Sequence, residues 1–315
     1  MRATGYLLVL SGSALWATNG IASTFVFDAG AISPTDLTAL RIFGSALVLG
    51  AGVVMLLPGL SRSSLTRLAL FGVFGVSLPQ WLFYEAISRI DVPIALVIVY
   101  TAPVLVTAYE RIARRRSLPL RVYLAILVAI GGVVGTVLGG SGGPGALSAA
   151  GLAFAVAAMV AYSGQILLAT AQPSELSPLQ RIGGAMVFGS LIWVVVDPPW
   201  TLPFRLVDDR ISLGSALHLT APTGLLVAYI IVLGTIVPYA MLVAGAPRIG
   251  AGAASVTGMA EPVVAAILAW ALLGQRLSGI QVGGIAVALC GVALAETLRS
   301  RTQRLGIVEE TIFAS

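Results

Sequence analysis

The 315-residue chain is 58% hydrophobic and only 10% charged, with a mean hydropathy of +0.99. This composition excludes an ordinary soluble domain and indicates an integral membrane protein, in which lipid surrounds most of the apolar surface. The net charge is +5, every basic residue is an arginine, and most arginines lie between apolar runs. We therefore interpret the positive charge as a topology signal and expect no nucleic-acid partner.

Ten segments are apolar enough to be spanning helices, which need roughly 20 residues each. The predicted helices are Thr4–Val26, Asp36–Leu57, Leu68–Ser88, Val92–Tyr109, Val122–Gly139, Ala149–Thr170, Pro178–Val196, Pro222–Ala244, Ala251–Leu273 and Ile280–Leu298. Arg2 and the apolar run behind it resemble a signal peptide, but the many spans that follow predict an uncleaved first helix. The fold class expected is therefore an all-α integral membrane protein.

The second half of the chain repeats the first. The stretch that begins at Pro247 aligns without a gap on the stretch that begins at Ser88, 159 positions earlier. An Arg-Ile pair and two prolines recur at this one offset, as Arg89-Ile90 with Arg248-Ile249, Pro79 with Pro238, and Pro103 with Pro262. We predict a first five-helix repeat over residues 1–140, a second over 141–298, and a solvated cytoplasmic tail over 299–315.

Each predicted repeat holds five spans, an odd number, so the second repeat must be inverted relative to the first. If both termini are cytoplasmic, most arginines, including those of the run Arg111–Arg121, fall on the cytoplasmic side. This bias predicts that orientation. The loop Asp197–Thr220 then lies outside, and a bacterial-type inner membrane is the expected location. Inverted repeats are typical of secondary transporters, whose binding site lies near the bilayer midplane between the repeats.

The segment from Glu261 to Leu294 resembles the ninth and tenth helices of EamA-type proteins of the drug/metabolite transporter superfamily. Its first-half copy, the region of Trp16 and Arg41 fit the same pattern, so the resemblance covers nearly all of the chain. One departure is Gln275, which stands where the family usually has the Glu of a Gly-Glu-Arg-Leu turn. The resemblance implies metabolite or amino-acid export, with the aromatic-amino-acid exporters nearest in character.

Aromatic and amide side chains form the first set of candidate substrate-binding residues. Trp16 and Asn19 are three positions apart, as are Tyr162 and Gln165 at the matching point of the sixth helix. Positions three apart share a helical face, so each pair would present a stacking plane and an amide to a ligand. The candidate set also includes Tyr84, Tyr100 and Tyr239. Amides that bond across helices, and aromatics that pack in the core, are the structural alternatives.

Charged residues inside spans form the second set. Glu261 is predicted near the centre of the ninth helix, where its first-half counterpart is Ala102, and an ionised carboxyl there costs a few kcal/mol. It is a candidate to bind a substrate ammonium or a proton, or else a protonated carboxyl bonded to backbone carbonyls. Arg41 is a candidate gate or carboxylate contact, or else a structural ion pair with Asp36 or Glu85.

Prolines inside spans predict kinks, because each removes a backbone donor and frees a carbonyl one turn earlier. We assign Pro79, Pro103, Pro238 and Pro262 to helix kinks and gating, with static packing kinks as the alternative. A freed carbonyl in a membrane needs a partner or water, which favours a position on a cavity.

Enzyme signatures are sparse, and we expect no catalytic residue, metal or cofactor. The dipeptide Ser163-Gly164 would suit an intramembrane serine protease only with a buried base to activate the serine. The only histidine, His218, falls in a loop outside the predicted spans. The sequence thus predicts a secondary transporter that exports small metabolites, in particular amino acids with aromatic or large apolar side chains, by alternating access. Its partners are the substrate, membrane lipid and, as a candidate coupling ion, the proton. A broad drug or nucleotide-precursor exporter is the alternative within transport, and a membrane enzyme acting on lipid or isoprenoid is the alternative outside it.

Overall fold

A computed structural model of the chain describes residues 2–30, 32–102, 104–105, 109, 112, 119–139, 148–169, 175–202, 208–213, 218–249, 254 and 257–313. The first half contains α1 (Arg2–Asp28), α2 (Pro34–Val54), the short η1 (Leu57–Gly59), the composite span α3–η2–α4 (Arg62–Leu70, Phe71–Ser77, Leu78–Ile87), α5 (Val92–Val99) and α7 (Leu120–Leu138). The second half contains α8 (Ala149–Ala169), α9 (Pro178–Val196), the composite span α10–η4–α11 (Thr223–Ile231, Val232–Ile236, Val237–Ile249), α13 with η5 (Ala260–Leu268, Ala269–Leu273) and α14 (Gly279–Phe313).

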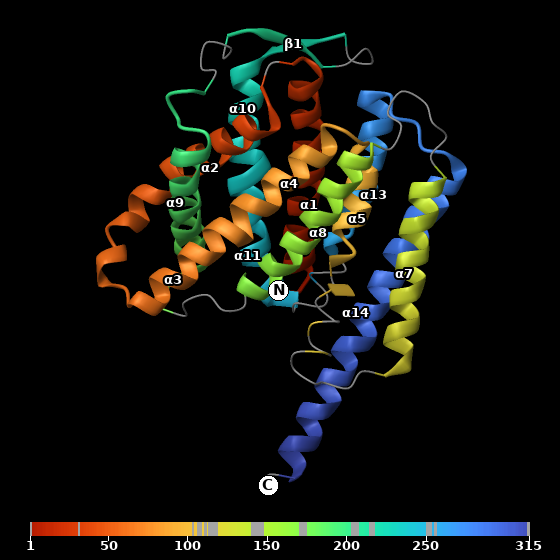
Figure 1. Ribbon diagram of the computed structural model, residues 1–315. Coiled ribbons are helices and arrows are strands. Elements are labelled where there is room, and N and C mark those ends of the chain that lie inside the picture. The colour runs from red at the N-terminus through yellow and green to blue at the C-terminus, as the bar shows by residue number, and fades with distance from the viewer. Residues whose placement is uncertain are drawn as a thin grey trace.

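Two features differ from the sequence predictions. A hairpin of β1 (Arg210–Ser212) and β2 (Thr220–Pro222) lies in the loop between α9 and α10, at the end of the bundle opposite the termini (Figure 1). The residues predicted as a solvated tail continue α14 as a helix to Phe313, beyond the rest of the bundle (Figure 1). A chain without prolines after the last span can extend the helix, because no residue there blocks it.

The second helices of the two repeats begin in the same way. Ser33 caps α2 and Ser177 caps α9, each accepting a hydrogen bond from the backbone N–H three residues on. The side chains of Asp36 and Gln180 bond back to the cap backbone, and a proline follows each serine. This is a capping box with proline at the first helical position, so the shared Ser-Pro dipeptide starts both helices at equivalent points.

Equivalent helices of the two repeats run antiparallel. In the α7–α14 pair, Gly132 lies against the backbone of Ala288 and Gly139 against Ile280, so residue numbers rise along one helix as they fall along the other. In the α2–α9 pair, Gly50 lies against Val187 and Gly183 against Val53, with the same sense. The second repeat is therefore inverted relative to the first. Small residues at the α7–α14 contact let the two backbones approach closely, as is common between membrane helices.

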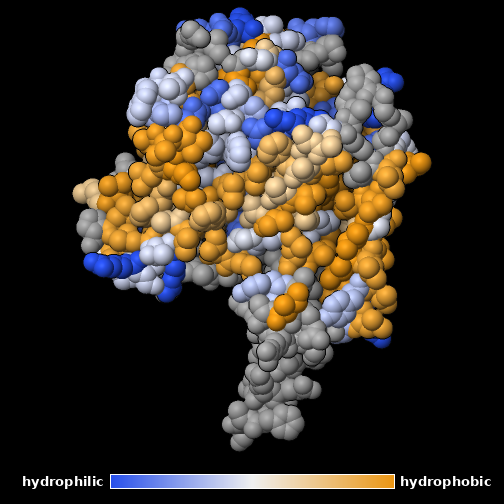
Figure 2. Space-filling model, viewed as in Figure 1, coloured by the Kyte–Doolittle hydropathy of each residue, from blue (hydrophilic) through white to orange (hydrophobic). Residues whose placement is uncertain are grey.

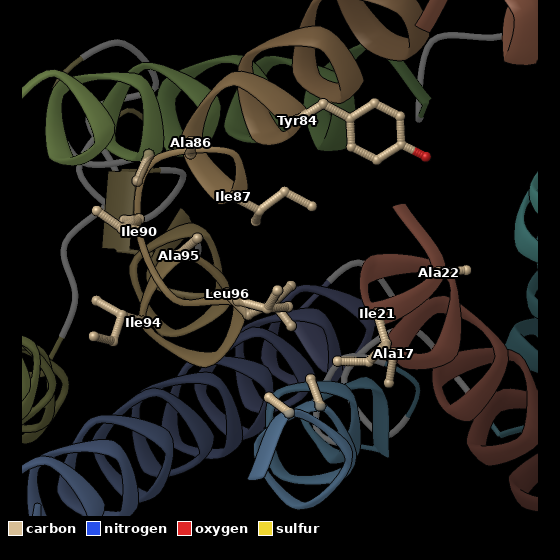
Figure 3. Close-up of a cluster of buried hydrophobic side chains, with 14 of the residues drawn as sticks. Ala17, Ile21, Ala22, Tyr84, Ala86, Ile87, Ile90, Ile94, Ala95 and Leu96 are labelled. Atoms are coloured by element: carbon tan, nitrogen blue, oxygen red, sulfur yellow. The ribbon is translucent and has the colours of Figure 1, made fainter. Parts of the chain in front are cut away.

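The largest buried cluster joins α1, α4, α5 and α13, with Ile94, Leu96 and Val97 on α5 among its members. In Figure 3 the ring of Tyr84 extends from α4 with its hydroxyl directed away from the apolar side chains of this cluster. Hydrophobic side chains also cover the flanks of the molecule, whereas hydrophilic ones gather around β1 (Figure 2). This distribution fits a bundle surrounded by lipid.

By length and composition alone, three described stretches meet the requirements for a membrane span: Arg62–Ile87, Leu179–Val196 and Thr223–Leu242. Shorter apolar helices of 10–17 residues occur at Leu120–Thr136, Ala149–Gln165, Ala260–Leu273 and Gly279–Ala295.

Candidate functional site

Both repeats interrupt their fourth span at the same place. The helix α5 ends at Val99 with Tyr100 as its C-cap, and α13 starts after Met259 as its N-cap. Tyr100 and Met259 are 159 positions apart and are therefore equivalent. Broken helices of this kind supply binding groups near the midplane in secondary transporters.

Glu261 lies in the first turn of α13 and is 8% exposed. The sequence predicts it near the centre of the ninth helix, whereas in the structure it is the second residue of α13, directly after a break. A carboxylate is favoured at a helix N-terminus, where the backbone N–H groups are unpaired and the helix dipole is positive. The break thus gives a membrane carboxyl a more favourable environment than a helix interior would.

Two tyrosines accompany Glu261. The Tyr100 hydroxyl donates a hydrogen bond of 2.7 Å to Glu261 Oε2. The Tyr100 ring lies 6.2 Å from the Tyr162 ring, at an angle of 46°. Tyr100 thus connects the carboxyl to the ring of Tyr162, and both tyrosines are only half-buried.

A second aromatic group joins α1 to α8 and α11. The rings of Trp16 and Tyr239 meet edge to face at 5.2 Å, and Gln165 Nε2 donates to the Tyr239 hydroxyl at 3.2 Å. Tyr239 and Glu261 are both close enough to Tyr162 to interact with it electrostatically. The Trp16 group and the Glu261 group are thus neighbours. Together they combine one acid with several aromatic faces.

Arg41 forms a third polar group, at the junction of α1, α2, α4 and η4. Its Nε donates to Thr235 Oγ1 at 2.5 Å, its Nη2 to the Gly234 carbonyl at 2.9 Å and its Nη1 to the Tyr84 hydroxyl at 3.0 Å. The Tyr84 hydroxyl in turn donates to Asn19 Oδ1 at 3.3 Å. The charge of Arg41 reaches Glu261, which connects this group with the other two.

The predicted partners of Arg41 are wrong. Asp36 bonds to the backbone of Ser33 in the α2 cap, and Glu85 pairs at 2.5 Å with Arg89, which lies just beyond the end of α4. Asp36 is five residues before Arg41 and does not share its face. The side chain of Arg41 instead points across the bundle to the second repeat, a direction that its own helix does not reveal.

A π-helical turn precedes the proline in the third span of each repeat. Pro79 follows η2 and Pro238 follows η4. A proline ring collides with the carbonyl four residues earlier, and those carbonyls belong to Gly75 and Gly234, inside the two π-helical turns. The wider π turn gives room for the ring and leaves carbonyls without helical partners. In η4 the side chain of Thr235 bonds to the Ile230 carbonyl at 2.8 Å.

The other two prolines assigned to kinks have different surroundings. Pro262 lies in the first turn of α13, where no backbone donor is needed. Pro103 lies outside the described residues.

Sequence reasoning missed Thr235 and the Gly234 carbonyl, the two groups that hold Arg41 against η4. One signal was present: the counterpart of Thr235 at the repeat offset is Val76, so a hydroxyl replaces a methyl group at an otherwise equivalent position. Thr18 was also missed, and its hydroxyl lies 2.5 Å from that of Tyr229.

An apolar cavity of about 500 Å³ lies between α2 and α10 and is lined by residues such as Phe43, Leu47 and Val227. None of its lining residues belongs to the three polar groups. We locate the candidate site at the polar groups, because an apolar opening beside lipid does not by itself select a solute.

Comparison with known proteins agrees with this architecture. The model of the EamA-like transporter family matches residues 3–138 and 149–297, one match in each half, which confirms the duplicated five-helix membrane fold. The Uncharacterized inner membrane transporter YicL of Salmonella typhimurium (strain LT2) is 26% identical over 279 residues, covering 86% of this chain and 87% of that protein. A crystal structure of a protein with 18% sequence identity superposes with a TM-score of 0.59, covering 96% of this chain and 99% of the other, and supports the fold alone.

Proposed function

Because the chain belongs to the EamA-like transporter family, and is therefore a secondary transporter and not an enzyme, we propose that it exports amino acids with aromatic or large apolar side chains. Its relative in Salmonella supports an inner-membrane location for this multi-pass protein. The observation that carries the substrate proposal is the Glu261–Tyr100 hydrogen bond beside the Tyr162 ring. One carboxylate among aromatic faces suits an ammonium group attached to an apolar body.

The mechanism we propose is alternating access between the two inverted repeats. Glu261, at the helix break, binds the substrate ammonium, and the aromatic groups of Trp16, Tyr100, Tyr162 and Tyr239 hold the side chain. A proton and an ammonium compete for the same carboxylate. The carrier therefore moves outward with substrate on Glu261 and returns with a proton on the same group. This competition gives exchange without a separate ion site.

The test is counterflow of labelled phenylalanine in proteoliposomes that contain the purified protein. We expect unlabelled phenylalanine inside to drive uptake of the label, with tryptophan and leucine competing and glycine not. Empty liposomes and the Glu261→Gln variant are the controls. Exchange of organic cations without exchange of any amino acid supports a broad drug exporter and overturns the substrate proposal.

A further inference from the structure

Arg41 is a buried cation that forms no direct ion pair with a described residue, and Glu261 acts on it only at longer range. It is 4% exposed, and no described carboxylate lies within 4.0 Å of its guanidinium. Its three hydrogen-bond acceptors are a hydroxyl of Tyr84, a hydroxyl of Thr235 and a carbonyl of Gly234, all neutral. A buried charge in a membrane protein is expensive without a counter-charge and marks a functional site. The guanidinium therefore has unused capacity for an anion.

Two of the three bonds fasten Arg41 to η4. Thr235 and Gly234 both lie in this π-helical turn, directly before Pro238, whereas Arg41 belongs to α2 of the other repeat. Asn19 of α1 also lies close to η4, where it fills the space that a Cβ at residue 234 would need. Arg41 thus bridges the repeats at the point where the eighth span departs from α-helical geometry.

In the part of the chain that the structure describes, the equivalent π turn in the first repeat has no such bridge. The tripeptide Phe-Gly-Ser recurs at 43–45 and 188–190, and this alignment places Met186 opposite Arg41, whereas the Ser-Pro caps align one residue earlier and place Ala185 there; both are apolar and buried. Met186 and Val76, the counterpart of Thr235, pack together in an apolar cluster. The same backbone feature is therefore held by apolar packing around η2 and by a charged side chain at η4.

We propose that Arg41 binds the carboxylate of the transported solute, and that this carboxylate displaces the hydrogen bonds from Arg41 to Thr235 and Gly234 and so releases η4 as the hinge of the eighth span. This inference rests on the proposed function, in which Glu261 binds the ammonium group of the same solute. A carboxylate accepts two parallel hydrogen bonds from a guanidinium, and such charge-assisted bonds are stronger than bonds to neutral acceptors. Nε has a single N–H, which now bonds to Thr235, so a carboxylate that binds along the Nε–Nη2 edge takes this donor and competes with the Gly234 carbonyl for Nη2.

The bond to Tyr84 uses Nη1 and survives this exchange. Tyr84 also donates to Asn19, so the hydroxyl keeps the guanidinium in place while η4 is freed. Binding at Arg41 would then change the backbone of one repeat and not of the other. The expected consequence is local: faster opening of Val232–Ile236, with Phe71–Ser77 as an internal reference within the same molecule.

The experiment is hydrogen–deuterium exchange of the full chain in lipid nanodiscs, followed in peptides that cover the two π turns. Three probes share one aromatic body: phenylalanine, 3-phenylpropionate, which lacks the ammonium, and phenethylamine, which lacks the carboxylate. We expect phenylalanine and 3-phenylpropionate to raise exchange at 232–236 roughly tenfold, as suits the loss of hydrogen bonds to a charged group. Phenethylamine should leave it unchanged, and no probe should alter 71–77.

Two variants test the bridge without any ligand. Arg41→Gln and Thr235→Val should each raise hydrogen–deuterium exchange at 232–236. Thr235→Ser, which keeps the hydroxyl, should exchange at the rate of the parent. Thr235→Val keeps the guanidinium, so 3-phenylpropionate should still bind to it. Arg41→Gln should weaken the binding of 3-phenylpropionate roughly ten- to a hundredfold, whereas the binding of phenethylamine should stay within about twofold of the parent. Thr235→Val also keeps the test usable if Arg41→Gln does not fold.

The outcomes separate the two proposals. If neither variant changes exchange at 232–236, or if bound phenylalanine slows it, Arg41 does not hold a hinge, even if counterflow of phenylalanine succeeds. If 3-phenylpropionate releases η4 but no amino acid exchanges across proteoliposomes, the carboxylate site stands and the amino-acid proposal fails.

Discussion

The two repeats share a backbone plan but carry different chemistry. Both have a Ser-Pro cap on the second helix, a π turn before a proline in the third span and a break in the fourth. The polar side chains at these points are not shared, because Met186, Val76 and Ala102 stand opposite Arg41, Thr235 and Glu261. Duplication explains the frame, and the substitutions that break the symmetry define the candidate site.

Each repeat contributes one of the two charges. Arg41 belongs to the first repeat and Glu261 to the second, and the charge of Arg41 acts on Glu261 between them. A solute that carries an ammonium and a carboxylate would have to engage both repeats at once. Motion of one repeat against the other would then change the contacts at both ends of such a solute, as alternating access requires.

The largest expected effect tests the inversion itself. In a Cys290→Ala background, a cysteine at Ser63 and one at Thr201, both exposed, should react with impermeant maleimide from opposite sides of the membrane. We expect Ser63→Cys to be labelled from the cytoplasm only and Thr201→Cys from outside only. A cysteine added to the C-terminus should be labelled from the cytoplasm, like Ser63→Cys. Labelling of both loops from one side contradicts the proposed orientation of the repeats.

The second largest effect concerns Glu261, which replaces the Ala102 of the first repeat. Glutamine keeps the shape and the hydrogen bond from Tyr100 but has no negative charge and does not titrate. We expect Glu261→Gln to lower exchange roughly ten- to a hundredfold, the loss of a bond to a charged group. Exchange that remains should not vary between about pH 5.5 and 8, because the variant has no carboxyl to titrate at this position.

The control is Glu175→Gln, an acidic residue at the loop before α9 that bonds to Ser64 at 2.5 Å and lies apart from the three polar groups. Its exchange and pH profile should match those of the parent. If Glu261→Gln shows a parental rate and pH profile, the carboxyl at α13 has an architectural role only.

Sequence alone predicted the frame well, for a physical reason. Spans of about 20 apolar residues and recurring prolines can be read directly from the sequence, and Pro79 and Pro238 predicted irregular helix at the two points that the π turns precede, although not the π geometry. Partners across helices were not predictable in the same way. Arg41 reaches Thr235 because α2 faces the third span of the other repeat and both residues lie at the same level of the bundle. The sequence of one helix carries no information on that level.

The break at Glu261 was missed for a related reason. Pro262 was predicted to kink the ninth helix and instead lies in the first turn of α13; a proline suits either position, and one sequence does not distinguish the two. The β1–β2 hairpin was missed because its strands have only three residues each and lie in a loop.

The aromatic groups are expected to give a smaller effect. Alanine at Trp16, Tyr100 or Tyr162 removes an aromatic contact worth about 0.5–1.5 kcal/mol beyond burial, so exchange of phenylalanine should fall about two- to tenfold. Leucine exchange should fall less. Tyr100→Phe is the matched control, because it keeps the ring and removes only the hydroxyl that bonds to Glu261. Equal losses for both solutes in every alanine variant indicate a collapse of packing instead.

The smallest effect lies at one end of the α2–α9 contact. Asp36, near the start of α2, interacts with Asp197, directly after α9, and Asp197 Oδ2 is buried with no hydrogen-bond partner among the described residues. Burial, and then the neighbouring Asp36 carboxyl, raise the pKa of Asp197 above its ordinary value of 3.8. With the two Ser-Pro caps aligned, the corresponding residues at the opposite end of this contact are Gln180 and Val53, so the acidic pair is another asymmetry between the repeats.

A raised pKa in the folded protein means that folding favours the protonated carboxyl. The stabilisation is fully present below the unfolded pKa and is lost as the pH rises through the folded pKa, after which two carboxylates repel each other. Asp197→Asn should therefore raise the apparent Tm at pH 8 and have little effect at pH 4. The gain should not exceed a few tenths of a kcal/mol, because solvent screens a pair near the surface. Thermal unfolding in detergent at the two pH values measures this difference, with Asp208→Asn, at an exposed loop position, as the control. An equal rise at both pH values would show that asparagine acts through packing, and the two ends of the α2–α9 contact would then differ in shape and not in charge.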